Sequence, residues 1–256
     1  METFTENCVK LSFMSIKKYT NKLYCFSPAV MLLTFLFESF AAGWVLFKYK
    51  TNEISRLIIY ILLALAGFQA AEFMVCGGFG FDGVQWARFG YVSITLLPPL
   101  GLHLAHKIAG KKVGAMVKLA YLTCAIFVFY YTFAVSTVEA GVCRANYSVF
   151  NTPNLWGELF GAYYYGWLII GVLFSVRQSK VLYAQKDKSS KIKSRALVWL
   201  TIGYVSFMLP TTVVNLIDPN TIEGIPSIMC GFAVILAIIL LGFVAPLTLE
   251  SKKKLQ

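Results

Sequence analysis

Seven long apolar stretches occupy most of this 256-residue chain, and each is long enough to cross a bilayer. A hydrocarbon core about 30 Å thick requires roughly 20 apolar residues per helix. We therefore expect an all-α integral membrane protein, a bundle of seven transmembrane helices that passes the cell membrane several times. The expected spans are Pro28–Phe47, Leu57–Cys76, Val84–His106, Lys118–Val135, Leu155–Val176, Ala196–Leu216 and Pro226–Pro246.

The composition leaves little of the chain for anything but these helices and their loops. Charged residues make up 14% of the sequence, whereas a soluble domain carries about 25%. We expect three parts: an extracytoplasmic or interfacial segment at residues 1–26, a seven-helix domain at 27–248 and a basic cytoplasmic tail at 249–256. Any catalytic output module is expected to reside on another protein.

The lysines and arginines between the spans fall mostly into alternate gaps. Of the 23 basic residues, 17 lie in the gaps at 48–56, 107–118 and 177–195 or in the tail. Cytoplasmic loops of membrane proteins carry such an excess of basic residues, so we expect the C-terminus inside and the N-terminus outside. The lysines of the first 26 residues are the exception to this pattern.

The net charge of +11 fits basic loops beside anionic lipid headgroups. No Gly-rich phosphate loop, zinc-type cysteine pairing or RNA-binding motif accompanies it, so no nucleic-acid partner is expected. We also expect no enzyme, because Gly-x-Ser-x-Gly, His-Glu-x-x-His and paired intramembrane aspartates are missing from the sequence. His103 and His106 share one helix face without further ligand-type residues, so we predict neither a metal site nor a cofactor.

The topology places four cysteines on the outer side or at outer helix ends, where disulfides persist. Cys76 closes the second span and Cys143 lies in the long fourth loop, so a bond between them would hold that loop over the bundle. Cys25 with Cys76 is the competing pair. Free thiols packed as small apolar groups are the third interpretation.

Glu38 is the deepest ionisable residue, about ten residues from either end of the first span. Intramembrane carboxylates are costly and are functional candidates for that reason. Burial favours the neutral acid. The side chain is therefore expected to act as a structural hydrogen-bond donor, a proton carrier or part of a ligand pocket.

Glu72 and Arg88 lie about one turn below either end of the seven-residue connection 77–83. Equal depth on antiparallel neighbouring helices predicts an ion pair, and an incompletely paired guanidinium would suit an anionic ligand group. Gln69 lies one turn deeper than Glu72 on nearly the same face.

Further polar side chains occupy the outer halves of their spans, among them Glu158, Asn215 and the three tyrosines 163–165. Together they outline a polar, aromatic-lined outer cavity of the kind that binds small ligands. An interfacial tyrosine belt with helix caps is the alternative. The predicted ligand-binding set is Glu38, Gln69, Glu72, Arg88, Glu158, Tyr164 and Asn215.

Two proline positions are expected to disturb the helices. Pro98-Pro99 lies in the middle of the third span and Pro210 in the sixth. Proline lacks the backbone donor and clashes with the preceding turn, so kinks are expected at both positions. The freed carbonyl groups need other partners, such as Ser93, Thr95 or a neighbouring helix.

The run Trp86-Ala87-Arg88-Phe89-Gly90-Tyr91, followed by Pro98-Pro99, His103 and Gly110-Lys111, resembles the third helix of a known family. That family is the N-terminal seven-helix sensor region of bacterial histidine kinases. Residues 156–176, 195–215 and 225–231 are similar to its fifth, sixth and seventh helices. The resemblance covers roughly residues 25–250 and implies a sensor that feeds a kinase or cyclase, a module that we do not expect on this chain.

The leading functional hypothesis is a stand-alone membrane sensor that binds a small or lipidic ligand in the outer half of the bundle. It would signal to a cytoplasmic or membrane partner through the basic segment Arg177–Arg195. The first alternative is an ion- or proton-coupled transporter or channel subunit that uses Glu38, Gln69 and Glu72. The second alternative is a structural membrane assembly protein.

Overall fold

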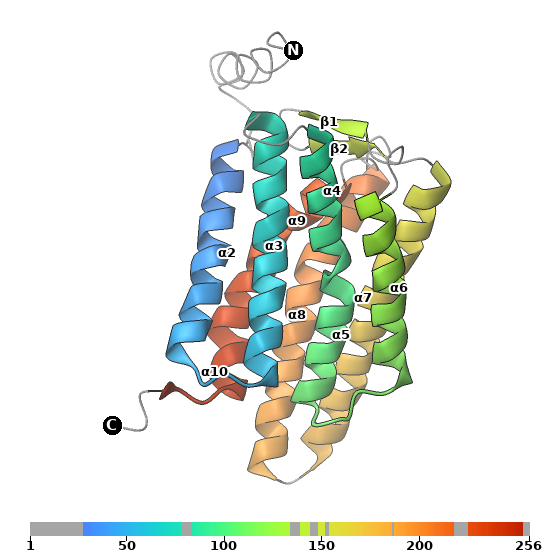
Figure 1. Cartoon of the computed structure of the whole chain (residues 1–256). Helices are drawn as coiled ribbons and strands as arrows, with labels where there is room; N and C mark the ends of the chain where they lie inside the picture. The colour runs from blue at the N-terminus through green and yellow to red at the C-terminus, as the bar shows by residue number, and fades with distance from the viewer. Residues whose placement is uncertain are drawn as a thin grey trace.

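The computed structural model describes residues 28–77, 83–133, 139–143, 148–151, 154–185, 187–217 and 225–252. Nearly all of these residues are helical. Long helices stand side by side as an elongated bundle, as Figure 1 shows. Six helices are long and apolar enough to cross a membrane. The expected segment 1–26 and most of the tail lie outside the described residues.

The first three columns of the bundle are α2 (Pro28–Lys48), α3 (Glu53–Gly77) and a pair of shorter helices set end to end. The pair consists of α4 (Gly83–Thr95) and α5 (Leu97–Ile108), and only Leu96 separates them. The interruption lies two residues before Pro98, where the proline pair was expected to disturb the helix. Because each half is short, neither counts among the six membrane-length helices.

The remaining columns are α6 (Ala115–Phe133), α7 (Asn154–Ala184), α8 (Lys188–Ile217) and a last column in three parts. That column contains α9 (Ile225–Ile239), the five-residue π-helix η2 (Leu240–Val244) and α10 (Ala245–Thr248). Short π segments are commonly found within longer helices. Pro210 lies inside α8, and the helix continues through it without interruption.

Helices α7 and α8 are longer than their apolar stretches predicted. Their 31 and 30 residues correspond to about 46 Å each, more than a hydrocarbon core of about 30 Å requires. Figure 1 shows the α7–α8 hairpin reaching beyond the ends of the other helices. Ser179 and Ser194 are buried where the two helices meet, and each hydroxyl reaches the other's main-chain carbonyl, at 3.2 and 2.8 Å.

A small antiparallel hairpin interrupts the otherwise helical structure at the opposite end. It consists of β1 (Glu139–Cys143) and β2 (Ser148–Asn151), with Cys143 opposite Ser148. Figure 1 places it across the helix ends near α4, and β1 contacts both α3 and α4. The sequence predicted only a long loop there.

The bundle has an apolar core and also apolar outer faces. Large side chains such as Phe68, Leu104 and Leu200 are fully buried. Others point outward, including Leu33 and Phe40 of α2 and Leu122 and Phe129 of α6, each at least 60% exposed. Apolar surface on this scale is typical of an interface with lipid or protein.

Backbone and side-chain contacts join the α2–α3 turn to the residues that follow α10. Tyr49 forms an isolated antiparallel bridge with Ser251, and the Lys50 amide donates a 2.9 Å hydrogen bond to the Glu250 carbonyl. The Lys50 ammonium also contacts the Glu250 carboxylate at 2.9 Å, and Lys252 reaches the Leu46 carbonyl. We call these contacts the 49–251 clip.

Candidate functional site

The buried carboxylate of Glu38 is the most unusual group in the interior. Glu38 lies ten residues into α2, about 15 Å from its start, and its exposed fraction is 0%. Within the part of the chain that the structure describes, neither carboxylate oxygen has a hydrogen-bond partner. A buried polar group left unsatisfied costs about 1–3 kcal/mol, so this position is energetically unfavourable unless something else binds it.

Two more polar side chains from α3 are buried in the same part of the bundle. Gln69 is 2% exposed and Glu72 is 1% exposed, one turn apart on α3, which packs along α2. Glu72 is close enough to Glu38 for the two carboxyl groups to interact electrostatically. The structure therefore places three of the predicted site residues together, on two neighbouring helices.

Arg88 lies on α4, which packs against α3. Helices α3 and α4 are neighbours, as their short connection predicted, and they approach closely because Gly67 and Gly90 have no side chain. A Cβ atom at Gly67 would lie 2.9 Å from the Ser93 hydroxyl, and one at Gly90 would lie 3.1 Å from the Ala71 Cβ. Ala71 next to Glu72 and Gly90 near Arg88 thus bring the two charged residues to similar heights. Their direct ion pair stays a prediction.

Two other predicted site residues, Glu158 and Tyr164, lie on α7. Glu158 is exposed on α7, whereas Tyr164 is buried at 5% and packs its ring 5.7 Å from that of Phe160. Asn215 lies near the end of α8, and its side chain lies outside the described part. The side chains of Cys25, Cys76 and Cys143 also lie outside it, so the disulfide stays a prediction.

Aromatic rings fill the contact between α4, α6 and α7. Tyr91 stacks on Tyr131 with ring centroids 4.5 Å apart, and Phe160 meets Tyr91 edge to face at 5.5 Å. Phe127 packs against Tyr163 at 4.9 Å. Edge-to-face and offset stacks of this kind add stability beyond the area they bury. These aromatic residues therefore form a packed cluster that joins the three helices.

Two neighbouring helices donate hydrogen bonds to a carbonyl group at the break between α4 and α5. In an unbroken helix the Thr95 carbonyl would accept from residue 99, but Pro99 has no N–H group. The Tyr163 hydroxyl of α7 donates to this carbonyl at 2.7 Å, and the Cys124 thiol of α6 donates at 3.5 Å. Of the expected partners, neighbouring helices supply the donors to the Thr95 carbonyl, although Cys124 was not foreseen. The Ser93 and Thr95 hydroxyls instead donate to the carbonyls of Phe89 and Tyr91.

Polar side chains of α5 occupy the half of the bundle nearer the basic loops. The His103 Nδ1 atom lies 3.1 Å from the Tyr121 hydroxyl, and the His106 ring stacks on Phe174 at 3.8 Å. Gly101 faces the phenol of Tyr204, which occupies the position that a Cβ at residue 101 would take. No sequence signal linked Gly101 to Tyr204, because that contact depends on how α5 and α8 are rotated.

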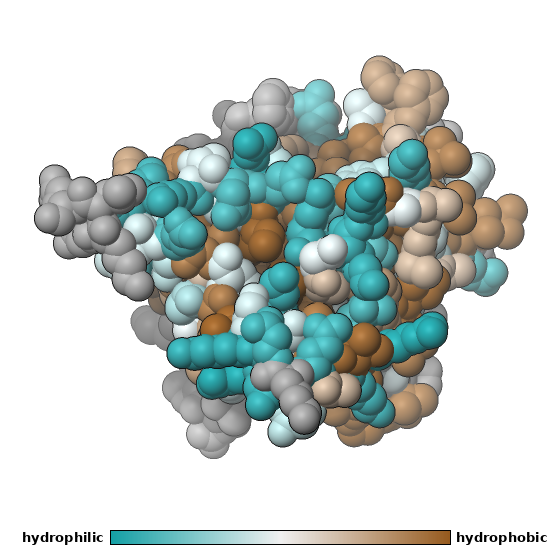
Figure 2. Space-filling model, turned by 90° about the horizontal axis from the view of Figure 1, so that it is seen from below, coloured by the Kyte–Doolittle hydropathy of each residue, from teal (hydrophilic) through white to brown (hydrophobic). Residues whose placement is uncertain are grey.

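The loops expected to be basic lie together at one end of the bundle, which Figure 2 views directly. Hydrophilic side chains are spread across this face, and hydrophobic ones show most toward its edge. Lys107 of α5 pairs with Glu53 of α3, and Lys50 pairs with Glu250. The distribution of charge along the sequence therefore corresponds to one face of the structure.

No protein-family model matches this chain, and a search of curated proteins finds no significant match.

Proposed function

We propose that this protein is a polytopic sensor of the cell membrane that binds a small or lipidic ligand among α2, α3 and α4. The observation that carries the proposal is Glu38, a fully buried carboxyl group without a hydrogen-bond partner among the described residues. Evolved proteins retain such costly groups chiefly at functional sites. A ligand with hydrogen-bond donors would satisfy Glu38, and Arg88 would suit an anionic group.

The proposed topology has seven spans, with α4 and α5 together forming the third. The C-terminus and the basic loops face the cytoplasm, since basic loops are retained on that side. A cytoplasmic or membrane partner would receive the signal at the α7–α8 hairpin. The resemblance to the sensor region of histidine kinases supports this division of roles. Cysteine labelling at positions 180 and 188 of intact cells tests it, because outside accessibility of both would reverse the orientation.

Ligand binding is tested by thermal-shift screening of the purified protein against small and lipidic compounds. A genuine ligand should raise the unfolding temperature of the wild type and lose that effect in Glu38→Gln and Arg88→Ala. Glu158→Gln is the matched control, since the same chemical change is made on an exposed carboxylate. Binders that are unaffected by the first two substitutions would refute the site.

A proton-coupled transporter is the second candidate, favoured by the electrostatic proximity of Glu38 and Glu72. Two carboxyl groups at different depths are the kind of arrangement that carries protons through a bundle. Proteoliposomes with an internal pH dye distinguish the two functions. Proton flux that is abolished in Glu38→Gln and retained in Glu158→Gln would favour the transporter over the sensor.

A further inference from the structure

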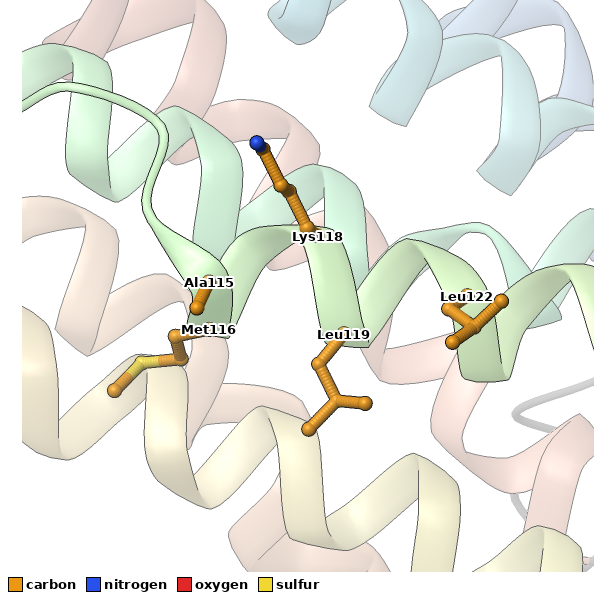
Figure 3. Close-up of a pocket in the computed structure, with 5 residues that line it drawn as sticks. All are labelled: Ala115, Met116, Lys118, Leu119 and Leu122. Carbon is orange, nitrogen blue, oxygen red and sulfur yellow. The ribbon is translucent and has the colours of Figure 1, made fainter.

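The outward face of α6 carries a shallow apolar depression next to the basic end of the bundle. Its volume is about 590 Å³, and Ala115, Met116, Lys118, Leu119 and Leu122 line it, as Figure 3 shows. Met116, Leu119 and Leu122 are 43%, 51% and 60% exposed, so this surface is open to the surroundings. Four of its five side chains are apolar, and the fifth is a cation.

The lysines near this depression lack acidic partners within the described ranges. The described ion pairs engage Lys50 and Lys107, but none engages Lys111, Lys112, Lys118 or Lys193. Gly110, with φ of +70°, ends α5 and lets the Lys111 amide return to the His106 carbonyl at 2.9 Å. The Lys193 ammonium lies 3.5 Å from the position of a Cβ at Gly110, so α8 adds a cation to this loop.

The direction of α6 places the lysines at the basic end of the bundle and the apolar surface one step deeper along the helix. Side chains on a helix tilt toward its N-terminus, and the N-terminus of α6 lies at the basic end. Lys118 therefore extends toward the level of Lys111 and Lys112, while Leu122 lies one turn deeper. A long lysine side chain in this position keeps its ammonium in the headgroup layer.

Helix α2 offers a comparison at the same end of the bundle. Its exposed apolar face also ends in a lysine, but the Lys48 ammonium is held over the rings of Trp44 and Tyr49, at 5.2 and 5.5 Å. On α6 no such aromatic contact is found for Lys118 among the described residues. The α6 face therefore combines apolar surface with cations that remain available to a ligand.

We propose that this face of α6 and the α5–α6 loop form a binding site for an anionic phospholipid. The acyl chains lie along Met116, Leu119 and Leu122, and the phosphate lies against Lys111, Lys112 and Lys118, with Lys193 nearby. Charge complementarity selects the headgroup, since each lysine near a membrane surface contributes about 1 kcal/mol toward an anionic lipid. The site is separate from the carboxylates of α2 and α3 and does not depend on the proposed sensing function.

Native mass spectrometry of the purified protein tests this site. The protein is equilibrated with equimolar phosphatidylglycerol and phosphatidylcholine that carry identical acyl chains, and the two adducts are counted. We expect phosphatidylglycerol to dominate in the wild type. Replacement of Lys111, Lys112 and Lys118 by glutamine should reduce that preference at least about fivefold. Equal retention of the two lipids by the wild type would overturn the proposal.

The matched control replaces Lys180, Lys188 and Lys191 of the α7–α8 hairpin by glutamine, which removes the same charge from the same end. This variant should keep the preference for phosphatidylglycerol. A loss of preference equal to that of the first triple variant would show a diffuse effect of charge and would overturn the site. Excess water-soluble glycerol phosphate should not displace the lipid, because it lacks chains for the groove, and full displacement would also refute the proposal. Thermal unfolding checks that each variant is folded. If the triple variant is unfolded, the single variants Lys118→Gln and Lys118→Arg replace it. Lys118→Gln should weaken the preference for phosphatidylglycerol, and Lys118→Arg should keep it.

Discussion

The Tyr163 hydroxyl lies 2.7 Å from the Thr95 carbonyl oxygen and joins α7 to the gap between α4 and α5. Pro99 leaves this carbonyl without its helical donor, and a tyrosine 68 residues later in the chain donates to it. The gap is therefore a fixed junction of three helices, with Cys124 of α6 as the third participant. Its stability depends on donors that lie outside the broken helix.

Tyr163→Phe should destabilise the protein by about 1 kcal/mol, because the Thr95 carbonyl loses its stronger donor. Thermal or detergent-induced unfolding measures the change. Tyr165→Phe is the control, since it removes the same atom from a neighbouring residue for which no hydrogen bond is found in the described part. Equal effects of the two substitutions would show that the bond to Thr95 contributes nothing specific.

Gly101→Ala should destabilise the protein by about 1–3 kcal/mol, because the new methyl group would overlap the Tyr204 phenol. The same measurement on Gly43→Ala provides the comparison. Gly43 also lies within a helix, but nothing lies within 4 Å of a Cβ added there. Alanine favours helix over glycine, so Gly43→Ala should be neutral or slightly stabilising. A Gly101→Ala variant as stable as Gly43→Ala would contradict the contact.

The reciprocal bonds between Ser179 and Ser194 predict non-additive substitutions. Ser179→Ala and Ser194→Ala should each destabilise the hairpin by about 1 kcal/mol, because each leaves the other hydroxyl with one partner fewer. The double variant should be less destabilised than the sum of the single ones, since no hydroxyl remains to be satisfied. Hydrogen exchange of residues 177–196 measures all three. Strict additivity would argue against the pairing.

The start of α8 should depend on pH through Asp187. The N–H groups of Ser190 and Ser189 donate to its carboxylate and hold the pKa of Asp187 below its usual value of about 3.9. The charged form caps the helix, so its stabilising contribution is present above pH 4 and is lost as the pH falls through the folded-state pKa. Hydrogen exchange at residues 188–191 should therefore speed up below that range.

Asp187→Asn provides the control for this effect. Asparagine also caps helices but does not titrate, so exchange in this variant should show no such step between pH 5 and pH 3. Exchange that accelerates equally in both proteins would assign the effect to another group.

The positions of the helices could be predicted because apolar stretches mark them directly. Six membrane-length helices and the break before Pro98 follow from hydropathy and from proline chemistry. The extensions of α7 and α8 could not be predicted in this way, since hydropathy falls after Val176 and rises again only at Ala196. There Asp187 caps the start of α8 locally, and the buried serines join the two helices through a tertiary contact that hydropathy does not reveal.

The depth of the candidate site residues in the bundle could be predicted, but the side chains around them could not. Counting residues placed Glu38 near the middle of α2 and Glu72 near the end of α3, and both are buried. Which side chains surround them depends on the rotation of each helix, which apolar spans of low amphipathicity do not encode. Glu158 is exposed and Tyr163 binds Thr95 for that reason, although the sequence treated both as members of one outer cavity.

The 49–251 clip has a mechanical consequence. Because Tyr49 is bridged to Ser251 and Lys50 to Glu250, the turn that ends α2 and the strand that leaves α10 must shift as one body. Displacement of residue 252 would therefore be transmitted to the end of α2, the helix that carries Glu38, as well as along the chain to α10. The ends of the first and last described helices are thus coupled, although the contacting residues lie 200 residues apart in the sequence.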